Sequence, residues 1–368
     1  MPPTSEQIAY FVSPHGFGHA ARASAVISAL QDRMPELAVD LFSRTPPWFF
    51  KDSLRGPYAY QELLTDIGLV QENPMVEDLD ATIEKLDDFL RFDAELIDRL
   101  AQKLKLDGCR LIVCDISPLG IAVANRADIP SVLIENFTWD WIYEGYPDYR
   151  EQFDVHIQHL QQIFSSATFR IQTAPNCDEQ PADLRVGPIC RKPRASREDI
   201  RQRLKVPESG KLVLITMGGI PDACGSLEQL RAFAGCRFLV PGDNERLTVD
   251  GNLTLLPYHS GLYHPDLVNA ADVVIGKVGY STLAEVYHAG TPFGYFTRPD
   301  FRESDVLSAF VRKNMPGVHM PGDTYKDGSW IGHLPELLEM SRAARNEANG
   351  ADVVADFLQE LLQRWQGV

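Results

Sequence analysis

The 368-residue sequence lacks several features that would place it in common classes of protein. It has no uninterrupted apolar run long enough to cross a bilayer, and no segment typical of a signal peptide. Its six cysteines are scattered without a CxxC pair, which favours reduced thiols in a cytosol over a disulfide framework. We therefore expect a cytoplasmic protein without a transmembrane segment.

Basic residues are also scarce. The chain has 35 lysines and arginines against 51 acidic residues, which gives a net charge of −16. This balance argues against nucleic acid or an anionic membrane as the main partner, although a local basic pocket for a diphosphate is compatible with it. No repeat at solenoid spacing is present, and the sequence carries no signal for an oligomeric state. With 44% hydrophobic residues, the chain is long enough for two well-packed domains.

Short β-branched runs alternate with helical segments along the whole chain. The predicted strands of the first half lie at 8–12, 38–42, 110–114 and 131–134, and helices are expected at 20–30 and 119–126. A second run of strands lies at 211–217, 238–240, 253–256, 273–275 and 293–296. This alternation predicts an α/β protein with two doubly wound parallel sheets. We place the domains at 1–190 and 197–350, with a basic, proline-containing linker at 188–196 and a terminal helix within 351–368.

Two other segments each allow two interpretations. Residues 45–50 are predicted to form a helix that starts with proline and is capped by Thr45. The Trp-Phe-Phe run of this helix either packs in the core or contacts lipid or a hydrophobic acceptor, and core packing is favoured. Residues 77–106 form a long amphipathic segment that contains Asp78 and Asp80, superficially a metal-binding DxD pair. The flanking pattern is helical, so we interpret these acids as helix-start residues and predict no metal site.

The stretch 271–292 combines a short strand, a glycine turn and a helix. Gly276–Gly279 break the apolar run, and Ser281 and Thr282 supply hydroxyls where a helix begins. Free backbone N–H groups and the helix dipole make such a turn a binding site for phosphate, and Lys277 adds a cation beside it. Judged by spacing alone, an ordinary βα unit with a tight turn is an equally good interpretation.

A second turn with candidate chemistry lies at 14–19, between the first strand and the first helix. Gly16 and Gly18 let a substrate approach the backbone, because no Cβ stands in the way. His19 follows at the helix N-terminus, where the dipole disfavours imidazolium and favours a neutral base. Asp115 ends a later strand; if that strand neighbours the first, its carboxylate can orient the imidazole. The alternatives are a packing histidine and an aspartate that caps the next helix.

Four motifs carry a resemblance to known proteins. They are His15–Arg22 (HGFGHAAR), Asn136–Tyr143 (NFTWDWIY), Gly276–Tyr280 (GKVGY) and Arg298–Ser304 (RPDFRES). Together they resemble nucleotide-sugar glycosyltransferases of the GT-B fold and, more closely, the glycosyltransferase-like N-terminal half of plant L-arabinokinases and their bacterial relatives. The resemblance spans nearly the whole chain. It implies two Rossmann-like domains that face a cleft, with the terminal helix crossing back to the first domain.

The resemblance also implies roles for individual residues. Plant natural-product glycosyltransferases hold diphosphate and ribose with a His, a hydroxyl residue and a Glu around a conserved glycine; counted from Gly279, these places hold Lys277, Thr282 and Glu285. Lysine in place of histidine departs from the pattern but keeps a cation at the pyrophosphate. His19 and Asp115 match the catalytic His and Asp of those enzymes. The residues expected to bind the donor are Gly18, Gly219, Tyr258, Lys277, Gly279, Tyr280, Ser281, Thr282, Glu285, Arg298, Asp300 and Glu303, and those expected to bind the acceptor are His15, Asn136, Trp139 and Asp140.

Three of these assignments keep an alternative. The segment 136–143 is an acceptor wall or a buried, Trp-rich helix start, and 298–304 holds donor-sugar hydroxyls or forms paired surface charges. His15 contacts the donor or the acceptor.

The sequence thus predicts a glycosyltransferase that moves a sugar from a nucleoside-diphosphate sugar, most simply a UDP-sugar, to a hydroxyl-bearing small-molecule acceptor. His19 is the expected base, transfer proceeds with inversion, and no metal or other cofactor is required. Two alternatives remain: a non-catalytic module that binds nucleotide sugars, and a UDP-sugar 2-epimerase, which has the same two-domain architecture.

Overall fold

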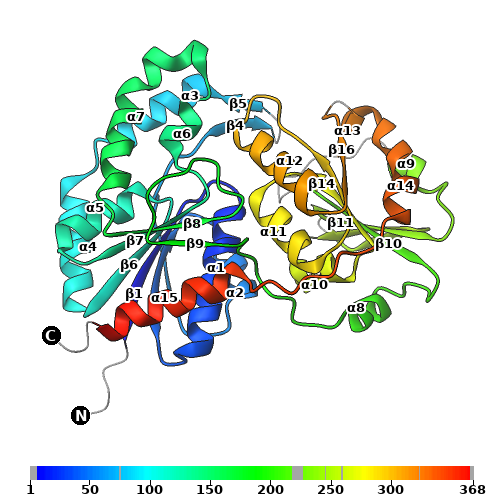
Figure 1. The fold of residues 1–368 in the computed structure, drawn as a ribbon, viewed down its shortest axis with the longest axis horizontal. Coiled ribbons are helices and arrows are strands. Elements are labelled where there is room, and N and C mark those ends of the chain that lie inside the picture. Colours follow the sequence, from blue (N-terminus) through cyan, green and yellow to red (C-terminus); the bar gives the residue numbers. More distant parts are fainter. Residues whose placement is uncertain are drawn as a thin grey trace. The chain divides into compact units, whose positions relative to one another are not determined.

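The computed structural model describes residues 6–73, 76–217, 227–244, 246–257, 260–322 and 324–364. The chain divides into two compact units, and each contains a seven-stranded sheet (Figure 1). Unit 1 takes the described residues of Met1–Glu72, Glu77–Cys190 and Ala348–Val368, and unit 2 takes those of Asn73–Val76 and Arg191–Glu347. No helix in the described ranges is long and apolar enough to span a membrane.

The sheet of unit 1 is parallel throughout, in the order β3-β2-β1-β6-β7-β8-β9. Its strands are β1 (Gln7–Val12), β2 (Ala38–Ser43), β3 (Ala59–Glu62), β6 (Cys109–Asp115), β7 (Ser131–Glu135), β8 (Phe169–Thr173) and β9 (Leu184–Val186). A separate two-stranded sheet joins β4 (Val70–Asn73) and β5 (Val76–Asp78). The chain order reverses at β1, between β2 and β6, and ligands of parallel α/β sheets bind outside the carboxyl ends of strands at such a point.

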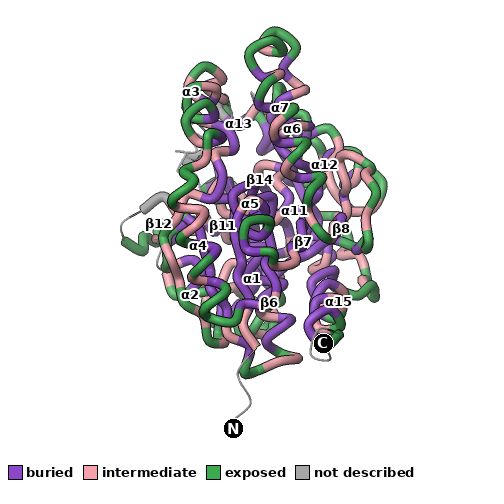
Figure 2. The backbone as a smooth tube through the Cα atoms, turned by 90° about the vertical axis from the view of Figure 1, so that its left-hand side faces the viewer, coloured by how far each residue is buried: buried purple, intermediate pink, exposed green. Residues whose placement is uncertain are grey.

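Helices cover both faces of this sheet. They are α1 (Gly18–Arg33), α2 (Pro47–Ser53), α3 (Leu79–Phe89), α4 (Ala94–Leu106), α5 (Pro118–Ala127), α6 (Trp139–Tyr143), η1 (Pro147–Tyr149), α7 (Arg150–Ser165) and α15 (Gly350–Arg364). Alternate residues of β1, such as Tyr10, share one core with α1, α2 and α15, whereas Gly120 of α5 packs against Phe11 on the other face. The central strands are therefore buried on both sides, as Figure 2 shows in purple.

The structure tests two predicted elements of unit 1, the segment 77–106 and the helix at 45–50. The amphipathic segment 77–106 is two helices, because Phe92 adopts a positive φ of 41° and Asp93 caps a new helix. Asp78 caps α3 by accepting from the Ala81 amide, which confirms its interpretation as a helix-start acid. Thr45 is not the cap of α2; Pro46 holds that position, and no side chain caps the helix. The Trp-Phe-Phe run packs against the core, as favoured.

Unit 2 has a mixed sheet in the order β12-β13-β11-β10-β14-β15-β16, in which only β12 runs antiparallel. Its strands are β10 (Lys211–Thr216), β11 (Cys236–Asn244), β12 (Thr248–Asp250), β13 (Leu253–Pro257), β14 (Val273–Lys277), β15 (Phe293–Phe296) and β16 (Gly317–Met320). Its helices are α8 (Arg197–Arg203), α9 (Leu227–Leu230), α10 (His264–Ala270), α11 (Tyr280–Ala289), α12 (Glu303–Asn314), α13 (Thr324–Asp327), η2 (Ser329–His333) and α14 (Leu334–Glu339).

Two apolar cores lie on the two faces of this second sheet. Val274 of β14 faces α10, α11 and α12, whereas its neighbour Ile275 faces η2 and α14. Successive side chains of one strand point to opposite faces, so a continuous apolar run is needed to fill both cores. The predicted α/β class, with two Rossmann-like doubly wound sheets, is therefore confirmed.

Candidate active site

The turn between β1 and α1 places a histidine at the carboxyl edge of the first sheet. Gly16 has φ +68°, a left-handed conformation that glycine adopts without strain, and α1 begins at Gly18. His19 follows in the first turn of α1 and is only 7% exposed. Its ring lies 6.1 Å from that of Phe137 and 6.3 Å from that of Trp139, centroid to centroid. The imidazole is therefore held among aromatic side chains rather than in open solvent.

A buried carboxylate orients this imidazole. Because β1 pairs with β6, Val12 lies opposite Asp115, and Nδ1 of His19 is 2.9 Å from Oδ1 of Asp115. We assign the Nδ1 proton to this contact, since an ionised carboxylate can only accept. No residue in the described ranges hydrogen-bonds Nε2 of His19, so that nitrogen is the one left for a substrate. Ser117, not Asp115, caps α5, which removes the capping alternative.

A third residue, Arg22, completes the cluster. Its Nε donates to Oδ2 of Asp115 at 2.7 Å, and its Nη2 donates to Oδ1 at 2.6 Å. Nη1 donates to Oδ1 of Asn136 at 2.6 Å. Burial raises the pKa of Asp115, but the Arg22 charge and the hydrogen bonds from Arg22 and His19 outweigh it, so the pKa lies below its ordinary value. The carboxylate thus stays ionised at neutral pH.

The role of Arg22 was not predicted, although the residue belongs to the HGFGHAAR motif. The signal was its spacing: three residues after His19 on one helix, it lies on the same face. Since arginine is usually exposed, a buried one is not expected without a partner, and only the fold reveals that partner.

Three of the four residues assigned to the acceptor, Asn136, Trp139 and His15, lie around this cluster. Asn136 and Trp139 are fully buried, so each supports a neighbouring side chain: Asn136 binds Arg22, and Nε1 of Trp139 donates to Asp66. The ring of His15 meets that of Trp139 edge-on at 5.0 Å. Asp140, in the first turn of α6, is partly buried, and burial raises the pKa of its carboxyl. Direct contact of these four residues with an acceptor stays a prediction.

Asp66 is a second carboxylate that the sequence analysis did not single out. It lies in the loop after β3, is 2% exposed, and its Oδ2 accepts hydrogen bonds from Ser13 at 2.7 Å and from Trp139. Burial raises the pKa of Asp66 to about 6. The neighbouring Thr65 donates to the carbonyl of Val12 at 2.6 Å, which fixes the loop against the end of β1. The four-residue strand before this loop, AYQE, has no apolar run to reveal it.

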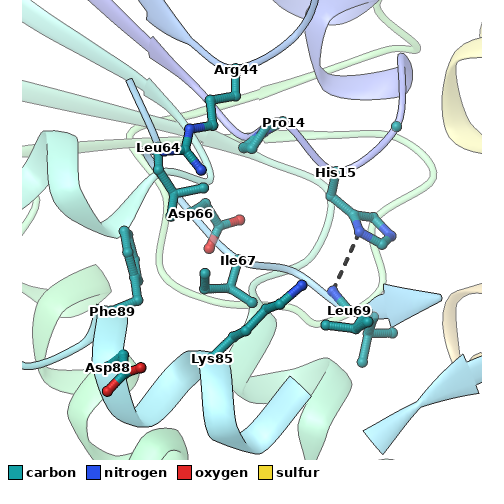
Figure 3. Close-up of a pocket in the computed structure, with 12 residues that line it drawn as sticks. Pro14, His15, Arg44, Leu64, Asp66, Ile67, Leu69, Lys85, Asp88 and Phe89 are labelled. Atoms are coloured by element: carbon teal, nitrogen blue, oxygen red, sulfur yellow. Dashed lines mark hydrogen bonds between the residues drawn. The ribbon is translucent and has the colours of Figure 1, made fainter. Parts of the chain in front are cut away.

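A pocket of about 560 Å³ opens at this edge of unit 1 (Figure 3). Its lining comes from the β1–α1 turn, the end of β2, the loop after β3, and α3, and consists of Pro14, His15, Gly16, Arg44, Leu64, Asp66, Ile67, Leu69, Val70, Lys85, Asp88 and Phe89. The Leu69 amide donates to Nδ1 of His15 at 3.3 Å, as the dashed line in Figure 3 marks. The volume falls within the range of small-molecule sites.

The predicted phosphate-binding turn lies in unit 2, between β14 and α11. Gly276 lies so close to β10 that an added Cβ would stand 2.1 Å from the Thr216 carbonyl oxygen. Gly279 is the N-cap of α11, and no side chain caps that end of the helix. Lys277 ends β14 and is half-buried, Tyr280 and Thr282 are buried, and Ser281 is partly exposed. The end of the ten-residue helix therefore keeps the features of an anion site.

Glu285, assigned to the ribose, is buried and bound on both of its oxygens. Arg191 donates to Oε1 through Nε at 3.0 Å and Nη2 at 2.9 Å, and Nδ1 of His264 lies 2.7 Å from Oε2. Burial raises the pKa of Glu285, but Arg191 and His264 outweigh it and lower the pKa below its ordinary value. The contact with ribose stays a prediction. Arg191 and His264 were not predicted as its partners, because they lie 94 and 21 residues from Glu285 in the sequence.

Of the remaining donor assignments, Gly18 begins α1 in unit 1, whereas Arg298, Asp300 and Glu303 belong to unit 2. Arg298 is buried, with its guanidinium carbon 3.4 Å from the centre of the Phe301 ring. Glu303 is buried at the start of α12, whereas Asp300 is exposed in the preceding loop. The two acids that the motif suggested as partners for donor hydroxyls thus differ in exposure, and their contact with a donor sugar stays a prediction. Gly219 and Tyr258 lie outside the described residues.

These features define the class of fold. Each of the two units is a Rossmann-like sheet, parallel except for β12, with helices on both faces. This is the GT-B fold of glycosyltransferases, and solved structures of that class match almost the whole chain. The calicheamicin glycosyltransferase CalG4 matches at a TM-score of 0.63 with 15% identity, over 98% of this chain and 99% of its own. A UDP-glucosyltransferase from Polygonum tinctorium matches at 0.62 with 14% identity (98% and 94%), and UGT71G1 from Medicago truncatula, solved with UDP-glucose, at 0.60 with 13% (98% and 93%).

The sequence comparison points to a more particular relative. An L-arabinokinase of Arabidopsis thaliana is 28% identical over 360 residues, which cover 96% of this chain and 34% of the relative. The chain therefore spans about a third of the length of that protein. No family model matches the chain. The predicted resemblance to GT-B glycosyltransferases and to plant arabinokinases is thus confirmed.

Proposed function

We propose that the protein is a glycosyltransferase that moves a sugar from a nucleoside-diphosphate sugar, in particular a UDP-sugar, to a hydroxyl of a small-molecule acceptor. The observation that carries the proposal is the contact of 2.9 Å between Nδ1 of His19 and Oδ1 of Asp115, at the carboxyl edge of a parallel sheet. The GT-B fold adds support, since one similar structure was solved with UDP-glucose.

In the proposed reaction, Nε2 of His19 accepts the proton of the acceptor hydroxyl. The hydroxyl oxygen forms a bond to the anomeric carbon, and the bond from that carbon to the diphosphate oxygen breaks. UDP leaves with the electron pair, and attack from the opposite side inverts the anomeric configuration. Asp115 stabilises the imidazolium that forms, as the carboxylate of a catalytic triad does.

On the donor side, we assign the leaving diphosphate to the N-terminus of α11. Developing negative charge would meet the backbone N–H groups after Gly279 and the ammonium of Lys277. These groups supply the electrostatic stabilisation that a metal ion supplies in other transferases, so the proposal includes no metal. We further assign Glu285 to the ribose and Arg298 with Glu303 to the donor sugar or its phosphate.

The decisive experiment measures both products of transfer. Purified protein is incubated with a panel of UDP-sugars and hydroxyl-bearing acceptors, and UDP release and glycoside formation are followed together. Replacing the base by His19→Gln should lower kcat by about 10²–10⁴-fold. His159→Gln, a change to a partly buried histidine on α7, serves as the matched control and should leave kcat unchanged.

Three results would count against the proposal. Full transfer activity in His19→Gln would remove the base from the scheme. UDP binding without turnover across the panel would favour a binding module, and isomerised sugar still attached to UDP would favour an epimerase.

A further inference from the structure

We propose that the acceptor is a small, hydroxyl-bearing acid, and that Arg44 and Lys85 hold its anionic group in the pocket of unit 1. This inference rests on the proposed function and deepens it, because it names the chemical class of the acceptor.

The two cations reach the pocket from separate elements. Arg44 directly follows β2, and Lys85 lies on α3, so the fold brings together residues that are far apart in the sequence. Figure 3 shows the Arg44 guanidinium and the Lys85 ammonium pointing into the hollow from opposite sides, with Asp66 and Ile67 between them. A guanidinium and an ammonium that face one space form a binding site for carboxylate or phosphate oxygens.

Neither cation is neutralised by the part of the chain that the structure describes. No carboxylate there lies within 4.0 Å of Arg44 or Lys85, although the chain carries 51 acidic residues. Asp88 lines the same pocket, but its carboxylate lies 3.9 Å from the guanidinium of Arg91 and is mostly exposed. The Oδ2 atom of Asp66 already accepts from two protein donors. An anionic ligand would therefore supply the partner that neither cation has among the described residues.

One side chain, Trp139, connects the pocket with His19, the proposed base. His15 and Asp66 line the pocket, and both contact Trp139, whose ring lies 6.3 Å from that of His19. In this proposal, a ligand is anchored by its acid group at Arg44 and Lys85 and extends from there towards His19. Its anion and its reacting hydroxyl would then occupy different ends of one molecule, a geometry typical of a sugar acid or a sugar phosphate.

The test is calorimetric titration of the full chain with three probes that share a sugar ring: glucuronate, glucose 6-phosphate and uncharged glucose. We expect at least one acid to bind about tenfold more tightly than glucose, and its binding to weaken as salt is added. The double variant Arg44→Gln/Lys85→Gln should weaken binding of that acid by about tenfold or more. The two acids decide between a carboxylate and a phosphate as the preferred anion.

Controls exclude a general effect of charge. Lys51→Gln/Arg55→Gln removes the same charge from exposed positions of unit 1 outside the pocket, and should bind the acid as the wild type does. Lys277→Met separates this pocket from the proposed donor turn, because a loss of acid affinity in that variant would place the acid at the donor turn instead. Far-UV circular dichroism confirms that each variant is folded.

The inference is overturned if glucose binds as tightly as both acids, if neither acid binds at about 10 mM, or if the pocket variant and the Lys51/Arg55 control lose affinity equally. UDP is titrated in parallel to separate this failure from that of the proposed function. If the protein binds UDP but neither acid, the inference about the acceptor fails and the proposed transferase function stands. If it binds an acid but transfers no sugar, the acid site stands and the proposed function fails.

Discussion

Arg22 binds both oxygens of the Asp115 carboxylate, at 2.7 and 2.6 Å, inside a part of unit 1 where both side chains are almost completely buried. The proposed base therefore does not face an isolated carboxylate but one whose charge a permanent cation already compensates. Arg22 thereby lowers the pKa of Asp115, and the ionised carboxylate fixes the orientation of the His19 ring, as a general base requires.

Removing the Arg22 charge should destabilise the protein through Asp115. In Arg22→Met the buried carboxylate loses the charge and the hydrogen bonds that lower its pKa, which should lower the free energy of unfolding by about 3–5 kcal/mol at neutral pH. A carboxylate with a lowered pKa stabilises the native state only where it is ionised, so this loss should shrink as pH falls below the ordinary carboxyl pKa of 3.8. Urea unfolding measures the loss at neutral and at acid pH, and an equal loss at both would show that Arg22 acts through packing alone.

Two further variants make the Arg22 test specific. Arg22→Lys keeps a cation beside Asp115 and should lose less stability at neutral pH than Arg22→Met. Arg126→Met breaks an ion pair with Asp98 on the surface, and should not change the free energy of unfolding measurably at either pH.

Asp66 should make stability depend on pH in the opposite sense to a salt-bridged carboxylate. Its pKa is raised from 3.8 to about 6 by burial, so the native state binds the proton more tightly than the unfolded state. Stability is therefore lost as pH rises from about 4 to about 6. Asp66→Asn keeps an oxygen for Ser13 and Trp139 without the charge. Its stability advantage over the wild type should be about 2 kcal/mol larger at pH 7.5 than at pH 4.5.

Urea unfolding at the two pH values measures this difference. The contributions of the other carboxylates to the pH dependence of stability cancel, because the variant and the wild type both contain them. Asp80→Asn, at an exposed position in the first turn of α3, is the matched control and should show the same stability difference from the wild type at both pH values. An equal difference for Asp66→Asn at pH 7.5 and pH 4.5 would mean that the raised pKa is wrong.

Much of the fold follows from the sequence because its signals are local. Apolar runs that must fill two cores mark the central strands, and the glycine turns at 16–18 and 276–279 follow two of them directly. The proximity of His19 to Asp115 also follows, since parallel neighbouring strands end at one edge of a sheet. The sequence did not predict which other residues meet there. Arg22 is buried against the usual preference of arginine, and Asp66 follows a short edge strand with no apolar pattern.

The partners of Glu285 illustrate the same limit. A ribose contact was inferred from the spacing of one motif, whereas the structure joins Glu285 to Arg191 and His264 from two other segments. Such contacts depend on how distant segments pack, and no periodicity records them.

Gly276 should be required for the pairing of β10 and β14. An added Cβ would stand 2.1 Å from the backbone oxygen of Thr216, an overlap that only a shift of the strands can relieve. Gly276→Ala should therefore lower the free energy of unfolding by about 1–3 kcal/mol. Gly332→Ala is the control, since an added Cβ there meets no atom within 4 Å. Equal unfolding curves for the two variants would contradict the close approach of the strands.

Lys277 should distinguish the diphosphate of the donor from its nucleoside. If its ammonium and the N-terminus of α11 hold the pyrophosphate, Lys277→Met should weaken binding of UDP by about 10–100-fold, because a charge-assisted hydrogen bond to an anion is lost. Uridine carries no phosphate, so its weaker binding should stay unchanged. Lys313→Met, an exposed lysine at the end of α12, controls for the loss of one positive charge in unit 2 and should bind UDP normally. Calorimetry with both ligands measures these affinities. An equal loss for UDP and uridine would place Lys277 away from the phosphates.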